Sequence, residues 1–449
     1  MRRVEKKSLG YLIIRFYANI FHRLSNRTIT VNGVENIPKD KPIILASNHQ
    51  NALLDALAIG FTNNTQPVFL ARADIFKKKF IARVLNYLKL APVYRMRDGK
   101  DSLDKNVEVF ENSVRILQNN RALCLFPEGT HIGLKSMLPH KKAIPRIVFI
   151  AAEMTNFELD INIVPIGLTY SHYYNFRRSV VVNYGQPISS KSYYSLFRDE
   201  GETKASNALR DDLYKAIDQL VVNVPDKAYY DIYNEAFEMA KPFAAKKLRL
   251  KYKDKYLVDI ERYIVERVSF LLNNNEALKT ELDEKAKQYH ILKEKLKIAE
   301  SELLKPAIGF RDIVKSLVVL LLLLPFAALG AICNGWVYYL TRYPMRKIVK
   351  DKQFYSTFTF GLSIIVYPIW FILLFVIFYV IFKSGFIALG LIILSVPSGI
   401  LAWELMKMMS SMITRIKIGL LKSKNNKHMA KLLELRIDLL SFYYQSINS

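Results

Sequence analysis

Three long stretches near the C-terminus contain no charged residue, and they constrain the fold of this 449-residue chain more than any other feature. They cover residues 316–341, 353–382 and 384–403. A helix of about 20 apolar residues spans the hydrocarbon core of a bilayer, so each stretch is long enough to cross a membrane. Because a water-soluble core does not need such runs, we predict a C-terminal membrane domain over residues 306–410.

The path of the first stretch has two interpretations. A segment 316–341 that enters the membrane and returns, broken near Pro325 and Gly330, is the favoured one. Three full crossings are the alternative, because Pro325 can kink a spanning helix whose freed carbonyl finds another partner. Two helices follow in either case, and we expect them at 356–382 and 385–405.

Basic segments flank the apolar stretches. They are residues 305–315, 342–352 and a basic tail at 411–449. An excess of Lys and Arg marks the cytoplasmic side of a membrane protein. We therefore expect an integral membrane protein with these segments, and the soluble part of the chain, on the cytoplasmic face.

The charge of the chain requires an acidic partner. The 65 Lys and Arg residues against 40 Asp and Glu leave a formal net charge of +25. Anionic lipid and nucleic acid are the two candidates. The apolar stretches favour membrane lipid, and the spread of basic residues, without a zinc-finger or RNA-binding signature, argues against nucleic acid. The only cysteines, Cys124 and Cys333, exclude a disulfide framework and a cysteine-rich zinc site. We expect no metal.

The rest of the chain is organised in three parts. Residues 1–28 place Leu9, Ile13 and Phe16 on one side of an amphipathic N-terminal helix, which lies either at the membrane interface or against the soluble domain. Residues 29–225 alternate short branched apolar runs with helical segments, the pattern of an α/β sheet domain. Residues 226–305 are rich in Lys, Glu and Leu and predict a charged helical arm, with a short coiled coil as one form.

The most informative block for chemistry is Ser47-Asn48-His49-Gln50-Asn51-Ala52-Leu53-Leu54-Asp55, directly after an apolar strand. Ligands of α/β sheets bind beyond the carboxyl ends of strands. On one regular helix His49 and Asp55 would point apart, so they can meet only if His49 lies in the loop. Asn51 is a good N-cap, which puts Asp55 in the first helical turn. A neutral His49 could then take a proton from a hydroxyl, oriented by Asp55. The alternative is a loop histidine and an acid that merely favours a helix start.

Three further blocks follow in order. They are Ala91-Pro92-Val93-Tyr94-Arg95, Leu125-Phe126-Pro127-Glu128-Gly129-Thr130 and Val164-Pro165-Ile166-Gly167-Leu168. Together with the His49 block, this set resembles the glycerolipid acyltransferase family over roughly residues 35–190. The resemblance extends to Tyr184-Gly185-Gln186-Pro187-Ile188. It implies an α/β acyltransferase domain that moves a fatty acyl group from a thioester to a hydroxyl.

The resemblance also assigns roles to residues. His49 matches the catalytic base and Asp55 the residue that orients it. Arg95 matches the position that holds the acceptor phosphate, a task that suits the arginine fork, whereas a solvated surface cation is the plain alternative. Glu128, Gly129 and Thr130 match the acceptor-binding block. Pro165 matches the fourth block, where we expect it to shape a turn beside the acyl thioester or a strand end.

Two departures from the common family pattern narrow the choice of branch within the family. Five residues separate His49 from Asp55 where most members have four, and His131 stands where an arginine is usual. Lys135 and Lys141 could supply the missing cation. These departures resemble the branch of glycerol-3-phosphate and dihydroxyacetone-phosphate acyltransferases that often carries a C-terminal membrane region.

The function that the sequence predicts is therefore acyl transfer to glycerol 3-phosphate or dihydroxyacetone phosphate in phosphatidic acid synthesis. A 1-acyl-glycerol-3-phosphate or other lysolipid acyltransferase is one alternative, and a non-catalytic lipid-binding scaffold is another. Acyl-CoA or acyl carrier protein would be the co-substrate, with no cofactor. No Ser or Cys in these blocks is placed as a nucleophile, which favours direct transfer. The oligomeric state is not predicted.

Overall fold

The structure is a computed structural model that describes residues 8–93, 102–251, 253–273 and 275–448. The chain divides into two compact units. The first consists of Met1–Pro225 with Lys253–Arg262, and the second of Asp226–Tyr252 with Tyr263–Ser449. The segment Lys253–Arg262 of the first unit belongs to the predicted helical arm, so the arm is divided between the units. The reason is local: Asp254 bonds to Thr28 and Ser179 of the first unit.

The first unit is built on a mixed sheet. Its strands are β1 (Asn26–Asn32), β2 (Ile43–Ser47), β3 (Val68–Arg72), β4 (Leu90–Val93), β5 (Ala122–Leu125), β6 (Asn162–Tyr170), β7 (Arg178–Tyr184) and β8 (Ile188–Ser189). In the described part of the chain the strand order is β1-β7-β6-β2-β5-β3-β4, with β8 paired to β6. Strands β2 to β6 are parallel to one another, whereas β7 and β8 run antiparallel to β6. The predicted α/β class is confirmed.

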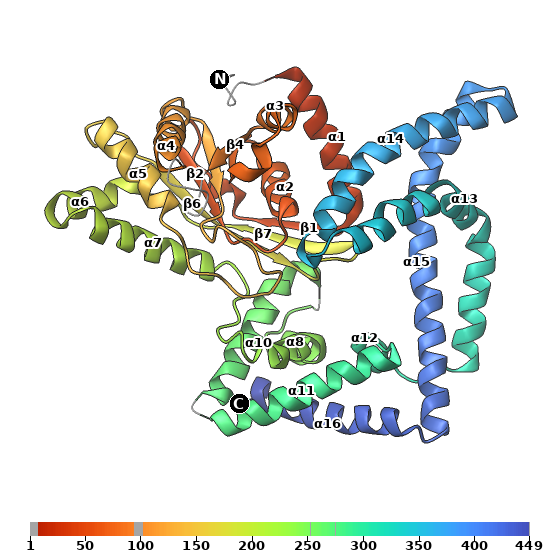
Figure 1. Ribbon diagram of the computed structural model, residues 1–449. Helices are drawn as coiled ribbons and strands as arrows, with labels where there is room; N and C mark the ends of the chain where they lie inside the picture. The colour runs from red at the N-terminus through yellow and green to blue at the C-terminus, as the bar shows by residue number, and fades with distance from the viewer. Residues whose placement is uncertain (1–7, 94–101, 252, 274, 449) are drawn as a thin grey trace. The chain divides into compact units, whose positions relative to one another are not determined.

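Helices cover both faces of this sheet. They are α1 (Leu9–Ser25), α2 (Leu53–Thr62), α3 (Lys79–Tyr87), α4 (Ser102–Gln118), α5 (Ala143–Met154), α6 (Tyr194–Glu200) and α7 (Glu202–Asp218). Successive side chains of a strand point to opposite faces, so Ile44 packs with α4, α5 and α7 while Ile43 packs with α2. Figure 1 shows α4 and α5 on one side of the sheet and α2 on the other. Burial on both faces explains why β2 and β6 read as continuous apolar runs.

Helix α1 has two different sides. Arg15 on one side donates to the carbonyls of Gly60 and Asn63 at the end of α2, 2.7 Å in each case. On the other side Leu9, Ile13 and Phe16 are exposed. The helix therefore packs on the domain through one side and presents an apolar stripe through the other.

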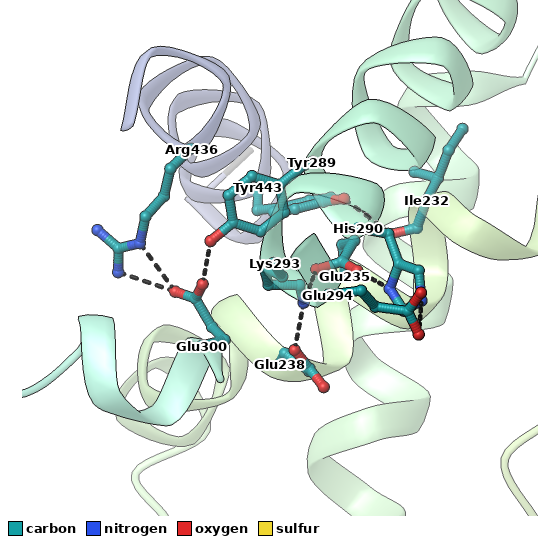
Figure 2. Close-up of polar contacts among 10 residues, drawn as sticks. All are labelled: Ile232, Glu235, Glu238, Tyr289, His290, Lys293, Glu294, Glu300, Arg436 and Tyr443. Atoms are coloured by element: carbon teal, nitrogen blue, oxygen red, sulfur yellow. Dashed lines mark hydrogen bonds and ion pairs between the residues drawn. The ribbon is translucent and has the colours of Figure 1, made fainter. Parts of the chain in front are cut away.

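The soluble part of the second unit is a helical bundle. Its helices are α8 (Tyr230–Met239), α9 (Lys241–Lys247), most of α10 (Leu257–Leu272), α11 (Glu276–Leu296), α12 (Glu300–Leu303) and α16 (Lys427–Asn448). Figure 2 shows polar contacts among α8, α11, α12 and α16. Lys293 donates to Glu235 and Glu238, and Arg436 donates to Glu300 at 2.9 Å. Charged residues of the predicted arm thus lie inside a bundle, where oppositely charged partners offset the cost of removing them from water.

Three helices of the second unit are long and apolar enough to cross a membrane: α13 (Phe310–Ile348), α14 (Tyr355–Phe382) and α15 (Gly385–Ser423). The break predicted near Pro325 and Gly330 is wrong, because α13 is helical throughout. Instead α13 changes direction along its length (Figure 1), as expected of a helix with an internal proline. Gly330 has a different role: a Cβ there would lie 2.1 Å from the Ser398 backbone, so glycine permits close packing of α13 on α15.

The basic tail expected at 411–449 is also structured. Helix α15 continues to Ser423 instead of ending near 405, and α16 forms the rest. Ser411 donates to Glu302 at 2.6 Å, and the ammonium of Lys417 donates to the carbonyl of Leu296 at 2.6 Å. Helix α16 buries an apolar stripe that includes Leu432 and Leu439.

Candidate active site

The candidate site lies at the carboxyl edge of the parallel strands. Strands β2 and β5 are parallel, so the loops that follow Ser47 and Leu125 leave the sheet at the same edge. The first loop carries His49 and the second carries Glu128. Two of the four sequence blocks therefore meet at the position where α/β sheets bind ligands.

His49 and Asp55 form a direct hydrogen bond. Nδ1 of His49 lies 2.8 Å from Oδ2 of Asp55. His49 is in the loop, and Asp55 is in the first turn of α2, as the sequence predicts. Because Asp55 has no solvent exposure, its carboxylate needs hydrogen bonds, and a proton on Nδ1 supplies one. This tautomer leaves Nε2 of His49 as a proton acceptor.

Backbone groups fix the Asp55 carboxylate further. The N–H groups of Gln50 and Asn51 each donate to Oδ2 at 2.7 Å. The N-cap of α2 is Ala52, not Asn51 as predicted, because Asn51 points its side-chain amide to the carbonyl of Tyr173, at 3.2 Å. Ala52 has a φ of 45°, an unusual conformation for a residue with a Cβ, and the turn it makes folds the loop back onto Asp55.

Two rings hold the His49 imidazole. Phe126 stacks on it with ring centroids 4.1 Å apart and planes at 15°, and His131 contacts it edge-on at 4.9 Å. The side chain of His49 is 16% exposed. Glu128, which is buried, accepts the backbone N–H of His49 at 3.4 Å through Oε1. The acceptor block thus braces the histidine loop as well as facing it.

Asn48 attaches the same loop to the neighbouring strand. Its side-chain amide donates to the carbonyl of Leu168 at 2.9 Å and accepts the N–H of Leu168 at 2.8 Å. Asn48 is fully buried, so it extends the β2–β6 pairing by a side chain. Further along β6, burial and the nearby charge of Asp55 hold the pKa of Tyr170 well above its ordinary value, so its phenol stays protonated.

Three other predicted site residues, Gly129, Thr130 and Lys141, are exposed to solvent. Gly129 and Thr130 are exposed at the start of the loop after β5, and Gly129 has a φ of 68°, which favours glycine. Lys141 is exposed, and its side chain lies beside Gly129. These three residues are therefore accessible to a ligand.

Lys135, which was predicted to supply a cation for the acceptor phosphate, is instead engaged in an ion pair. Its ammonium is buried and pairs with Glu261, because a cation in that position needs an opposite charge. Pro165 is also not in a turn. It lies inside β6, paired with Ala46, and accepts the N–H of Gly185 at 2.8 Å. Its side without an N–H faces the gap between β7 and β8, where a strand tolerates proline.

Arg95 lies outside the described residues, so its predicted contact with phosphate stays a prediction. Within the described residues, no group of three or more His, Cys, Asp or Glu side chains is placed to hold a metal ion. The cations described near the site are on exposed side chains such as Lys141.

The sequence missed several residues that support the site. The sequence predicted no contact for Phe126 beyond its place in the Glu128 block. Its position at a strand end, directly before Pro127 and Glu128, could have indicated a contact with His49. Asn48 gave no separate signal, because its partner Leu168 is distant in sequence. The two backbone donors to Asp55 carry no side-chain signature at all.

Comparisons with known proteins find sequences that are similar to part of this chain. Residues 28–169 match the family model described as Acyltransferase. Glycerol-3-phosphate O-acyltransferase 2 of Saccharomyces cerevisiae is 28% identical over 122 residues, which are 27% of this chain and 16% of the yeast protein. A 1-acyl-sn-glycerol-3-phosphate acyltransferase of Borreliella burgdorferi is 29% identical over 122 residues, which are 27% of this chain and 46% of that protein. The chain thus matches less than half of the length of either relative.

The solved structure of the 1-acyl-sn-glycerophosphate (LPA) acyltransferase PlsC from Thermotoga maritima aligns with 46% of this chain and 78% of that one, at a TM-score of 0.32 and 19% identity. The segment that matches the Acyltransferase family model contains His49, Asp55 and the Glu128 block. This part of the first unit is therefore similar to glycerol-3-phosphate and 1-acyl-glycerol-3-phosphate acyltransferases.

Proposed function

We propose that this protein transfers a fatty acyl group from an acyl thioester to the hydroxyl of glycerol 3-phosphate or dihydroxyacetone phosphate, an early step of phosphatidic acid synthesis. The observation that carries the proposal is the bond between His49 Nδ1 and Asp55 Oδ2, at the carboxyl edge of the sheet and within the matched family segment. It gives the base that a hydroxyl nucleophile requires.

The chemistry follows from the tautomer. Nε2 of His49 accepts the proton of the acceptor hydroxyl while the hydroxyl oxygen attacks the thioester carbonyl carbon. The new C–O bond forms, the C–S bond breaks, and the thiolate leaves with the proton from the imidazolium. Asp55 stabilises the imidazolium, and the two backbone N–H groups that donate to its Oδ2 fix its position.

The loop after β5 supports acceptor binding. Gly129 and Thr130 are exposed, the next residue His131 contacts the His49 ring, and backbone at a glycine lets a ligand approach closely. Lys141 and Arg95 are the proposed contacts of the acceptor phosphate, for which Arg95 offers two parallel hydrogen bonds. Acyl-CoA or acyl carrier protein is the proposed donor.

The second candidate acceptor is a lysolipid, 1-acyl-glycerol 3-phosphate. Proteins named for both acceptors are among the relatives, at 28% and 29% identity. The five-residue spacer between His49 and Asp55 favours the non-acylated acceptors.

The setting we propose is the cytoplasmic face of a membrane. Helices α13 to α15 are long and apolar enough to cross it. The apolar stripe of α1 and the exposed Lys77, Lys78, Lys79 and Phe80 would contact the lipid surface from the first unit.

The test is acyl transfer by purified protein in vesicles, with palmitoyl-CoA and one of three acceptors: glycerol 3-phosphate, dihydroxyacetone phosphate or 1-acyl-glycerol 3-phosphate. Product from the first two supports the proposal. Product from the lysolipid alone would replace it with the second candidate. No product from any acceptor, with acyl-CoA or with acyl carrier protein as donor, would contradict both and favour a lipid-binding scaffold.

A further inference from the structure

The loop between β5 and α5 has no regular structure of its own. Strand β5 ends at Leu125 and α5 begins at Ala143, with no helix or strand between them. Long loops of this kind in compact domains are usually functional. The loop closes on itself, because the N–H of Lys141 donates to the carbonyl of Pro127 at 2.7 Å.

One end of this loop forms the acceptor side of the site. His131 contacts the ring of His49, and the preceding Gly129 and Thr130 are exposed. Any displacement of the loop would therefore move the proposed acceptor contacts relative to the base.

The middle of the loop is held by a buried ion pair. The ammonium of Lys135 donates to Glu261, and the two side chains are 8% and 0% exposed. A buried pair is directional, and loss of one partner leaves an uncompensated charge that must find water. The pair therefore holds the loop in one position.

Neutral hydrogen bonds support the pair. The carbonyl of Lys135 accepts the N–H of Val224 at 2.7 Å, and the hydroxyl of Ser136 donates to the carbonyl of Val224 at 2.8 Å. The N–H of Met137 donates to the side chain of Asn223 at 2.8 Å. All of these residues belong to the first unit.

Glu261 comes from outside the matched family segment. The segment ends at residue 169, whereas Glu261 lies in the first turns of α10, which belong to the first unit. Part of the predicted arm thus contributes to the first unit.

We infer that Lys135 and Glu261 are positioning residues for acceptor binding, which act by fixing the loop 127–141 beside His49. This inference rests on the proposed function. Neither residue needs to touch the substrate. Their loss should weaken the binding of the acceptor more than that of the acyl donor, because only the acceptor contacts are proposed to lie on this loop.

The test compares Glu261→Gln and Lys135→Met with two matched controls. Lys142→Met removes an exposed cation from the same region, and Glu266→Gln removes an exposed carboxylate from α10. We expect the two pair variants to raise the KM of the acceptor about tenfold, because sub-ångström misplacement of binding groups has effects of this size or larger. The KM of palmitoyl-CoA should stay within about twofold, and both controls should match the wild type.

Two further variants separate positioning from loss of folding. The reversed pair Lys135→Glu with Glu261→Lys should recover most of the acceptor KM. Ser136→Ala, which removes a single neutral hydrogen bond, should raise it only about twofold to threefold. The double variant Lys135→Met with Glu261→Gln should raise the acceptor KM no more than either single variant does, because the two residues act through one contact.

Hydrogen exchange measured by mass spectrometry gives a readout that does not depend on activity. Exchange at residues 129–142 should be faster in Glu261→Gln than in the wild type and unchanged in Glu266→Gln. Unchanged exchange and an unchanged acceptor KM would overturn the inference, as would equal changes in the KM values of donor and acceptor. Faster loop exchange in a protein that transfers no acyl group to any acceptor would instead retain the loop tie and reject the proposed function.

Discussion

In the described part of the chain, each unit has a histidine whose Nδ1 bonds to a buried carboxylate, and the surroundings of these two bonds differ. Nδ1 of His49 lies 2.8 Å from Asp55, and Nδ1 of His290 lies 3.2 Å from Glu235. Both carboxylates are buried. Figure 2 shows the second pair among the charged residues of the bundle.

The partners of the two carboxylates set them apart. Glu235 also accepts a hydrogen bond from the charged ammonium of Lys293, at 2.5 Å. Asp55 instead accepts two backbone N–H groups. His290 is 45% exposed on a regular helix, and its bond to Glu235 raises its pKa. His49 lies between two rings in a loop at the edge of the sheet.

This difference shows what makes such a pair chemically useful. A carboxylate neutralised by a lysine joins helices and has little negative charge left to stabilise an imidazolium. A carboxylate held by backbone groups keeps its charge and its position while the histidine exchanges a proton. The two pairs are therefore expected to respond to mutation in opposite ways.

The largest expected difference concerns the carboxylates themselves. Asp55→Asn should lower turnover by about 10²- to 10⁴-fold, because an amide can neither hold the correct tautomer nor stabilise the imidazolium. Glu235→Gln should leave turnover per folded molecule unchanged. Both are measured as acyl transfer by equal amounts of folded protein. Turnover of Asp55→Asn within tenfold of the wild type would contradict the assignment.

Removing the cation from the bundle should mainly affect stability. Lys293→Met leaves Glu235 buried without its lysine and should lower the free energy of unfolding by about 3–5 kcal/mol. The control Lys287→Met, at an exposed ammonium paired with Asp283, should leave the free energy of unfolding close to that of the wild type. Unfolding of the detergent-solubilised protein by denaturant measures both. Equal stability of the two variants would show that the buried network is not a structural tie.

A smaller effect should appear with pH, at a third histidine. Burial lowers the pKa of His140 to about 4, and its ring contacts Tyr214 edge-on. The unfolded chain takes up this proton near pH 6.5 but the folded one only near pH 4. The free energy of unfolding should therefore fall as pH drops between these values, by on the order of 3 kcal/mol at most.

The check on this effect is the midpoint of unfolding at pH 7 and pH 5. His140→Phe should lose less stability than the wild type over this interval, and the exposed control His428→Phe should lose as much as the wild type. An identical pH response of His140→Phe and wild type would show that His140 does not cause the loss of stability. The sign is opposite to that of His290, whose raised pKa favours the folded state at low pH.

Local patterns predicted those parts of the molecule that depend on local sequence. The apolar run into His49 predicted strand β2, and the expected N-cap at Asn51, one residue before the observed Ala52, placed Asp55 in the first turn of α2. The family resemblance identified the second loop through Glu128. The apolar runs gave the three long helices, although a proline could not tell a bend from a break.

Contacts between distant residues could not be predicted. Lys135 and Glu261 are 126 positions apart, so Lys135 read as a free cation suited to phosphate. The same holds for Asn48 and Leu168, at 120 positions. The start of α2 was predicted one residue early, because backbone donors to Asp55 took priority over side-chain capping by Asn51.

Palmitoyl transfer by His49→Ala and by His290→Ala tests whether His49 is the catalytic base. Each variant is measured in vesicles with the acceptor that the wild type prefers. Each variant removes one of the two paired histidines. We predict that His49→Ala loses at least about 10²-fold in turnover with normal folding and membrane insertion, and that His290→Ala stays within about twofold of the wild type. Undiminished transfer by His49→Ala, or equal losses in the two variants, would contradict the account.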